Sequence, residues 1–376
     1  MRVPYHRHNL GRRELAELAD TISGLFITTA SKTAKFEEKF AGFMGYQNAR
    51  AVGVTSATAA LHLALLASGI KPGDEVITTP LSFFATANAI LYAGARPVFV
   101  DVEEETGNIN ADLISKAITK RTKAILPVHL YGQMSDMKRI NSLSKRYGLR
   151  VIEDSAHCIE GSRDGIRPGQ LSDAACFSFH AIKTLTSGEG GAIVVRNPKI
   201  ERVLKQLRAH GLAQGALERR HKNAPQDMVR LGWKYNMSDI QASLLLPQIP
   251  LLKKRRKIRE RIAERYESAF RKAGIAMPQL VKGVKSSRSI FTIWVNPREH
   301  DAVMERIRKA GVEVLVVFRP IHLSSYYRRL GYKKGMFPVA ERIGASNIAL
   351  PIYPKLTVEE ITTVIKAVLS AAQHHV

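Results

Sequence analysis

The stretch AVGVTSATAALHLALLA, residues 51–67, decides the fold class of this chain of 376 residues. Its first four residues, Ala51 to Val54, are apolar without alternation and predict a strand that is covered on both faces. Small and hydroxyl-bearing residues follow, and the apolar run from Ala59 to Ala67 predicts a buried helix. Because polar residues interrupt the stretch, we expect a core strand and helix here rather than a membrane span.

The same order of elements repeats further along the chain. Strands are predicted at residues 75–77, 97–100, 123–126, 150–152 and 192–195, and helices at 85–93, 111–118 and 137–147. Repeated strand–helix–strand order predicts an α/β fold with a mostly parallel central sheet and helices on both faces.

The pattern changes after about Asn236. A basic helical run begins at Lys253, strands are predicted at 290–295 and 312–317, and helices at 301–310 and after Thr357, which can cap the last one. We therefore predict two domains, a large α/β domain at residues 1–248 and a smaller α+β domain at residues 249–376.

Composition narrows the classes of function. The 57 basic and 33 acidic residues give a formal charge of +24, which suits anionic substrates as well as nucleic acid. No zinc-finger spacing, RNA-recognition aromatic motif or basic zipper is present, so no nucleic-acid partner is predicted. The two cysteines form neither a metal clip nor a disulfide framework. We expect no bound metal. Because no secretion signal is recognised, we expect a cytoplasmic protein that does not associate with membranes.

Candidate ligand-binding residues follow the predicted strands, where ligands collect in open α/β sheets. Ser56, Ala57 and Thr58 open the helix after the first strand, where free N–H groups can bind phosphate. Asp154 ends the strand at 150–152. Lys183 lies in a loop after the strand that carries Ser178, and a lysine whose pKa is lowered by its surroundings can form a Schiff base.

Taken one by one, these residues have simpler explanations: a helix cap, a capping aspartate, a surface lysine. Together they match the groups that bind pyridoxal phosphate, because a lysine binds its aldehyde carbon, an aspartate pairs with its pyridinium nitrogen and a helix N-terminus holds its phosphate. Phe83 is the candidate for covering the ring, although it could equally be a core residue like Phe84.

The sequence resembles the DegT/DnrJ/StrS sugar aminotransferases, which are pyridoxal-phosphate enzymes of fold type I. The resemblance extends over nearly the whole chain, from FEEKFA at 36–41 to PIYP at 351–354. The runs that carry it are PGDEVI (72–77), PVFVD (97–101), VHLYGQ (128–133), IEDSAH (152–157), SFHAIK (178–183), EGG (189–191) and KYNMSD (234–239).

The resemblance implies a role for each matching residue. Lys183 would form the Schiff base and move the proton, Asp154 would pair with the ring nitrogen, and Phe83 would stack on the ring. Ser178 and Thr58 would bind the phosphate, and His157 would lie beside the phenolic oxygen. Asn236 would reach the phosphate of a neighbouring subunit, which implies a homodimer with shared active sites, and His322 would lie on the substrate side.

The implied reaction is a ping-pong transfer of the amino group from L-glutamate to a nucleotide-linked keto-sugar, with C4 of a keto-deoxy sugar favoured over C3. Three alternatives are a sugar dehydratase of the same family, in which a histidine replaces the lysine, a regulatory protein with this fold, and a basic nucleic-acid-binding protein. The intact set of Lys183, Asp154 and Ser178 disfavours the first two.

Two departures from the family pattern are visible. Ala57 stands where glycine is usual, which is tolerable only if its φ is negative. Pro247 and Pro250 interrupt the helix after the Asn236 run, so we expect a bend or break there, with a possible change in the dimer surface or the substrate mouth.

Overall fold

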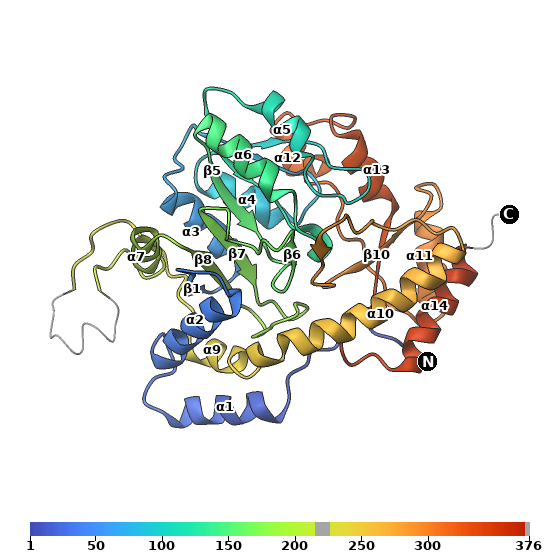
Figure 1. Ribbon diagram of the computed structural model, residues 1–376, viewed down its shortest axis with the longest axis horizontal. Helices are drawn as coiled ribbons and strands as arrows, with labels where there is room; N and C mark the ends of the chain where they lie inside the picture. The colour runs from blue at the N-terminus through green and yellow to red at the C-terminus, as the bar shows by residue number, and fades with distance from the viewer. Residues whose placement is uncertain (215–225, 373–376) are drawn as a thin grey trace.

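Seven strands form the central sheet of the computed structural model, which describes residues 1–214 and 226–372 (Figure 1). Their order across the sheet is β1-β8-β7-β5-β4-β2-β3. Only β8 runs antiparallel to its neighbours, so the prediction of a mostly parallel sheet is confirmed. The strands are β1 (Arg50–Val54), β2 (Glu75–Thr78), β3 (Arg96–Phe99), β4 (Thr122–Leu126), β5 (Arg150–Asp154), β7 (Ala174–Ser178) and β8 (Gly191–Val195).

Helices cover both faces of this sheet, and the strand pleat divides the core accordingly. In β1, Val52 and Val54 pack in the cluster that contains α3, whereas Ala51 packs on the other side with Phe36 and Phe40 of α2. The helices of this part are α1 (Arg12–Ser23), α2 (Ser31–Met44), α3 (Ala57–Ala67), α4 (Phe84–Tyr92), α5 (Ala111–Ala117), α6 (Met137–Tyr147), α7 (Pro198–Leu207) and α9 (Asp239–Leu245).

The second half of the chain builds its own apolar cluster around a two-stranded antiparallel sheet, β10 (Phe291–Trp294) and β11 (Asn347–Leu350). The helices here are α10 (Leu252–Lys272), α11 (His300–Lys309), α12 (Ser325–Arg329), α13 (Pro338–Ser346) and α14 (Val358–Ala372). A short ladder of β6 (Ser162–Arg163) and β9 (Val284–Lys285) joins the two halves.

We propose that the boundary between the two domains lies between residues 248 and 249. Residues 215–225 and 373–376 lie outside the described residues. The N-terminal end also contributes to the second cluster, because Val3 is fully buried there and bridges to Val312.

The break at the two prolines is confirmed. Helix α9 ends at Leu245, a single turn follows at Ile249–Leu251, and α10 begins at Leu252. Figure 1 shows α10 running from α9 along the edge of the molecule to α11 and α14. The predicted cap of the last helix is also confirmed, because the Thr357 hydroxyl accepts the Glu360 N–H at 3.2 Å and the Glu360 carboxylate accepts the Thr357 N–H at 3.0 Å.

The predicted strand at 312–317 is wrong. This segment forms single bridges only, Val312 with Val3 and Leu315 with Ala349. The Asn347 side-chain oxygen accepts the N–H of Val317 at 2.7 Å, so a side chain takes the place of a ladder partner. Apolar β-branched composition alone did not reveal that competition.

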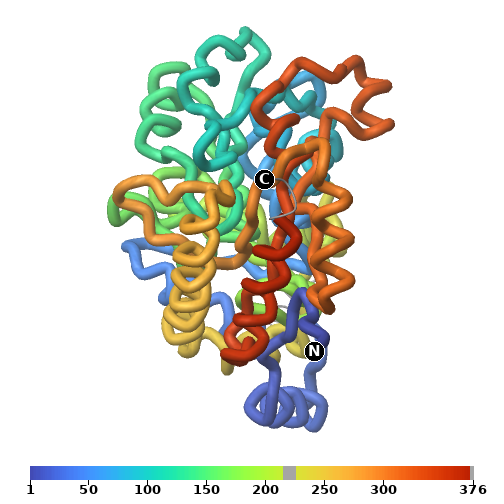
Figure 2. Tube along the Cα trace, turned by 90° about the vertical axis from the view of Figure 1, so that its right-hand side faces the viewer, coloured from blue at the N-terminus to red at the C-terminus, as the bar shows by residue number. Residues whose placement is uncertain are grey.

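Helix α1 stands at the margin of the molecule in both views (Figures 1 and 2). It packs on α9, and Leu15 and Ile22 on its surface are 65% and 61% exposed. Among the described residues, no helix is long and apolar enough to span a bilayer.

Candidate active site

A cavity of about 640 Å³ opens where strands β1, β5 and β7 end. Of the residues that the sequence singles out, the cavity lining contains Ser56, Ala57, Thr58, Phe83, Asp154, His157, Ser178 and Lys183. These positions span more than 120 residues of sequence, and the parallel sheet brings them together because its strands end at one edge.

Lys183 lies in a turn after β7, where its N–H donates to the His180 carbonyl at 2.9 Å. Burial lowers the pKa of the Lys183 ammonium to about 8, and the nearby Asp154 carboxylate opposes that shift. A buried amine of this kind is neutral far more often near neutral pH than a surface lysine, so it is suited to nucleophilic and proton-transfer chemistry.

Asp154 is the last residue of β5 and is 5% exposed. Its Oδ2 accepts the Thr86 hydroxyl at 2.7 Å, and its Oδ1 accepts the Ala156 N–H at 3.1 Å. Burial raises the pKa of the Asp154 carboxyl, while these two hydrogen bonds oppose the rise. A buried carboxylate at this position is stabilised when a cation binds beside it in the cavity.

The N-terminus of α3 lines the same cavity as Asp154. Ser56 caps the helix, because its Oγ accepts the Ala59 N–H at 3.1 Å. The N–H groups of Ala57 and Thr58 belong to the first turn and have no partner within the helix, so they can bind an anion. Ala57 is not among the residues with positive φ, so its Cβ causes no backbone strain.

Gly191 allows a close approach to this helix end. A Cβ at Gly191 would lie 2.5 Å from the Ser56 carbonyl carbon and 2.7 Å from the Ala57 nitrogen. Such separations are not possible, so glycine is required for β8 to lie against the helix N-terminus. The EGG run at 189–191 thus has a steric explanation.

His157 and Phe318 form a stacked pair on one wall, with ring centroids 5.6 Å apart and planes 24° from parallel. Burial lowers the pKa of His157 well below its ordinary value, so the ring is neutral. Its buried Nδ1 has no hydrogen-bond partner in the part of the chain that the structure describes. Phe83 lies at the cavity mouth, 56% exposed, with its ring centroid 5.8 Å from that of Phe318.

Of the other three candidate residues, only Ser178 lines the cavity. Ser178 ends β7, and its Oγ accepts the His180 N–H at 3.4 Å. Asn236 does not line the cavity of its own chain, and its side-chain nitrogen donates to Thr29 Oγ1 at 2.5 Å. His322 is also outside the lining; it is fully buried, and its Nε2 lies 2.9 Å from Glu341 Oε1. The roles of Asn236 and His322 therefore stay predictions.

Many lining or supporting residues were not found from the sequence, and three of them illustrate why. Thr86 follows Phe83 by one helical turn, and only the fold reveals that it faces Asp154. Tyr5 and His6 enter the cavity because the N-terminal segment pairs with residues 311–313. A pairing over more than 300 residues leaves no local signal in a sequence.

The residues present fit pyridoxal phosphate. One cavity is lined by Lys183, Asp154 and the first residues of α3. The buried Nδ1 of His157 has no hydrogen-bond partner among the described residues, so it can bind a polar atom of the cofactor. No group of three or more histidine, cysteine or acidic side chains suited to a metal occurs within residues 1–214 and 226–372. Cys158 and Cys176 are free and buried.

Comparisons with known proteins agree with this geometry. The model of the DegT/DnrJ/EryC1/StrS aminotransferase family matches residues 8–369. The uncharacterized protein MJ1066 of Methanocaldococcus jannaschii is 40% identical over 97% of this chain and 96% of its own. The spore coat polysaccharide biosynthesis protein SpsC of Bacillus subtilis is 36% identical over 97% of this chain and 96% of its own.

Among solved structures, the putative sugar aminotransferase Spr1654 of Streptococcus pneumoniae, in its PMP form, superposes with a TM-score of 0.92. It is 30% identical, with 98% of this chain and 99% of that chain covered. The expected fold type I architecture and the expected cofactor, pyridoxal phosphate, are thereby confirmed.

Proposed function

The chain belongs to the DegT/DnrJ/EryC1/StrS aminotransferase family, and from this premise we propose that it transfers the amino group of L-glutamate to a nucleotide-linked keto-sugar. One observation carries the proposal: the Lys183 amine, the Asp154 carboxylate and the N-terminus of α3 face the same cavity. The SpsC protein of B. subtilis bears a name in polysaccharide biosynthesis, and Spr1654 a name as a sugar aminotransferase, which supports a sugar as acceptor.

The bound cofactor supplies an electron-withdrawing ring that makes the C–H bond beside the substrate nitrogen acidic. The Asp154 carboxylate would pair with the ring nitrogen and favour its protonated form. Lys183 stands at the position of the lysine that attaches the cofactor in this family. Its neutral amine would accept the proton from the substrate carbon and return it. Because the pKa of Lys183 is lowered to about 8, the amine can accept and release that proton near neutral pH.

Other residues hold the reactants. Thr58, Ser178 and the free N–H groups of α3 would bind the phosphate, and Phe83 and His157, which line the same cavity, would hold the ring. Apolar lining residues such as Ile290 and Val317 exclude water from the reacting carbon. Arg319 also lines the cavity, and its guanidinium can meet an anionic group of either substrate.

We also propose a homodimer in the cytoplasm. Asn236 lies outside the cavity of its own chain, which is consistent with a role in the active site of a second subunit. Apolar side chains gather on α1 and the segment after it, with Leu25 77% and Ile27 53% exposed, and a partner would cover them. Light scattering after size-exclusion chromatography tests the dimer, and a monomer at micromolar concentration would contradict it.

The covalent assignment is tested by borohydride reduction of the purified protein with pyridoxal phosphate, followed by peptide mapping. We expect modification at residue 183, loss of the yellow colour when glutamate is added, and no multiple turnover in Lys183→Ala. A map without modification at 183 overturns the proposal. A panel of nucleotide keto-sugars, offered to the glutamate-treated protein, identifies the acceptor and whether C4 or C3 is aminated.

A further inference from the structure

A buried carboxylate lies directly behind the Lys183 loop. Glu160 follows His157 by three residues, and its side chain is 2% exposed. Its Oε1 accepts Arg259 Nη2 at 2.6 Å, and its Oε2 accepts the Thr184 hydroxyl at 3.2 Å. Thr184 is the residue after Lys183, so Glu160 touches the loop that carries the amine.

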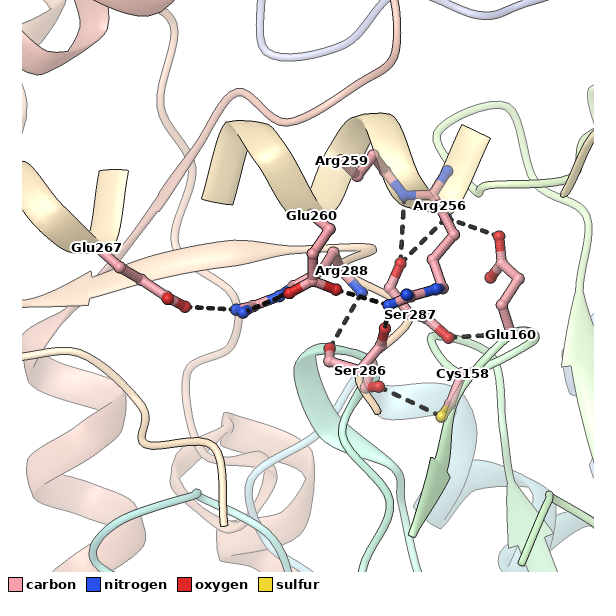
Figure 3. Close-up of polar contacts among 10 residues, drawn as sticks. Cys158, Glu160, Arg256, Arg259, Glu260, Glu267, Ser286, Ser287 and Arg288 are labelled. Atoms are coloured by element: carbon pink, nitrogen blue, oxygen red, sulfur yellow. Dashed lines mark hydrogen bonds and ion pairs between the residues drawn. The ribbon is translucent and has the colours of Figure 1, made fainter. Parts of the chain in front are cut away.

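Arg259 holds this carboxylate from the connecting helix α10. Its side chain is 2% exposed, and its Nε and Nη2 also donate to the Ser287 carbonyl at 3.2 and 3.0 Å. Figure 3 shows Arg259 and Glu160 meeting beside Ser287, whose hydroxyl in turn accepts the Glu160 N–H at 3.1 Å. A buried ion pair with this many hydrogen bonds has a fixed geometry, whereas loss of one member leaves an uncompensated charge.

A second contact reaches the same loop from the turn between α9 and α10. Gln248 is 1% exposed, and its Nε2 donates to the Thr186 carbonyl at 2.7 Å. Its Oε1 accepts the Thr186 N–H at 3.4 Å and Arg255 Nη1 at 3.3 Å. The loop is therefore held at residues 184 and 186, neither of which lines the cavity.

The loop depends on such contacts because residues 179–190 form no helix or strand. An irregular segment without ladder hydrogen bonds keeps one conformation only where side chains and turns supply the missing constraints. Displacement of a reacting group by about 1 Å can cost on the order of a hundredfold in rate.

We propose that Glu160 and Gln248 are positioning residues, anchored by Arg259 and Arg255 of α10, that fix the Lys183 loop so that its amine points at the cofactor aldehyde. Neither residue lines the cavity, so each acts through the loop rather than by touching the cofactor. The proposal rests on the proposed covalent role of Lys183.

The test measures how fast the full-length protein, stripped of cofactor, binds pyridoxal phosphate covalently. Thr184→Val removes the hydroxyl at nearly constant volume, and we expect attachment at residue 183, trapped by borohydride, to slow about tenfold. Thr184→Ser keeps the hydroxyl and restores the rate. Gln248→Leu is expected to slow attachment to a similar extent, because it releases both backbone groups of Thr186.

The matched control is Glu267→Gln. Glu267 accepts Arg288 Nη1 at 2.5 Å on the same helix α10 (Figure 3), and no hydrogen bond or ion pair to residues 183–186 is found for either residue. We expect Glu267→Gln to change the melting temperature but not the rate of covalent attachment at residue 183. A Thr184→Val protein that attaches the cofactor within twofold of the unaltered rate overturns the positioning role, whereas absence of any adduct at residue 183 in the unaltered protein overturns the function itself.

Discussion

The lowered pKa of Lys183 predicts an unusually reactive amine whose reactivity levels off at moderate pH. A pKa of about 8 leaves about one-tenth of the amines neutral at pH 7, whereas the ordinary value of 10.5 leaves about three in ten thousand. The buried amine is thus roughly 300-fold more available at pH 7 than that of an unperturbed lysine. The cause is burial, which penalises the ammonium more than Asp154 stabilises it.

The assay follows covalent attachment of pyridoxal phosphate to the full-length, cofactor-free protein between pH 7 and 11, with borohydride trapping and peptide quantification. We expect the rate at residue 183 to rise about fivefold from pH 7 to pH 8, less than twofold from pH 8 to pH 9, and to flatten above that. Lys254, exposed on α10, is quantified in the same digest as an internal reference and should continue to rise. A rate at residue 183 that climbs steadily through pH 10 would refute the reasoning.

Stability gives an independent measurement of the same shift. The folded-state pKa lies below the unfolded one, so the buried ammonium costs stability below pH 8, and the cost is relieved as the pH rises from 8 to 10.5. A shift of this size corresponds to about 3 kcal/mol. In urea unfolding, the stability of the cofactor-free protein should therefore rise by about that amount over this range relative to Lys183→Met.

Three further substitutions follow from the site and the core. Gly191→Ala should weaken cofactor binding at least tenfold, measured by spectroscopic titration, because its Cβ would collide with the Ser56 backbone, whereas Gly42→Ala, with nothing within 4 Å, should leave binding unchanged. Thr86→Val removes a hydrogen bond that lowers the pKa of Asp154, so the acid limb of the rate profile should move to higher pH, whereas Thr86→Ser should keep it in place. Phe40→Ala should lower the free energy of unfolding by about 3–5 kcal/mol in urea titrations, because Phe40 is fully buried and its ring contacts those of Phe177 and Phe179; a loss below about 1 kcal/mol would contradict this packing.

Local patterns predicted the central sheet and the polar residues at the strand ends that line the cavity, because both depend on short-range signals. Strand Arg150–Asp154 and the turn after it are read directly from apolar runs and the polar residues that end them. The contacts of Thr86, His6 and Glu160 could not be read in this way, because each depends on segments that only the completed fold brings together. The strand wrongly predicted at 312–317 has the same origin, since the side chain of Asn347, some thirty residues away, supplies the competing hydrogen bond.

The position of β8 between β1 and β7 has a consequence for how the protein is made. Strand β1 leaves the ribosome well over a hundred residues before β8, its partner in the sheet, so its apolar edge stays open through much of translation. The helix end that we propose to bind the phosphate follows β1, and Lys183 lies in the loop that leads into β8. A nascent chain halted before Gly191 would contain both chemical groups without the strand that joins β1 to β7.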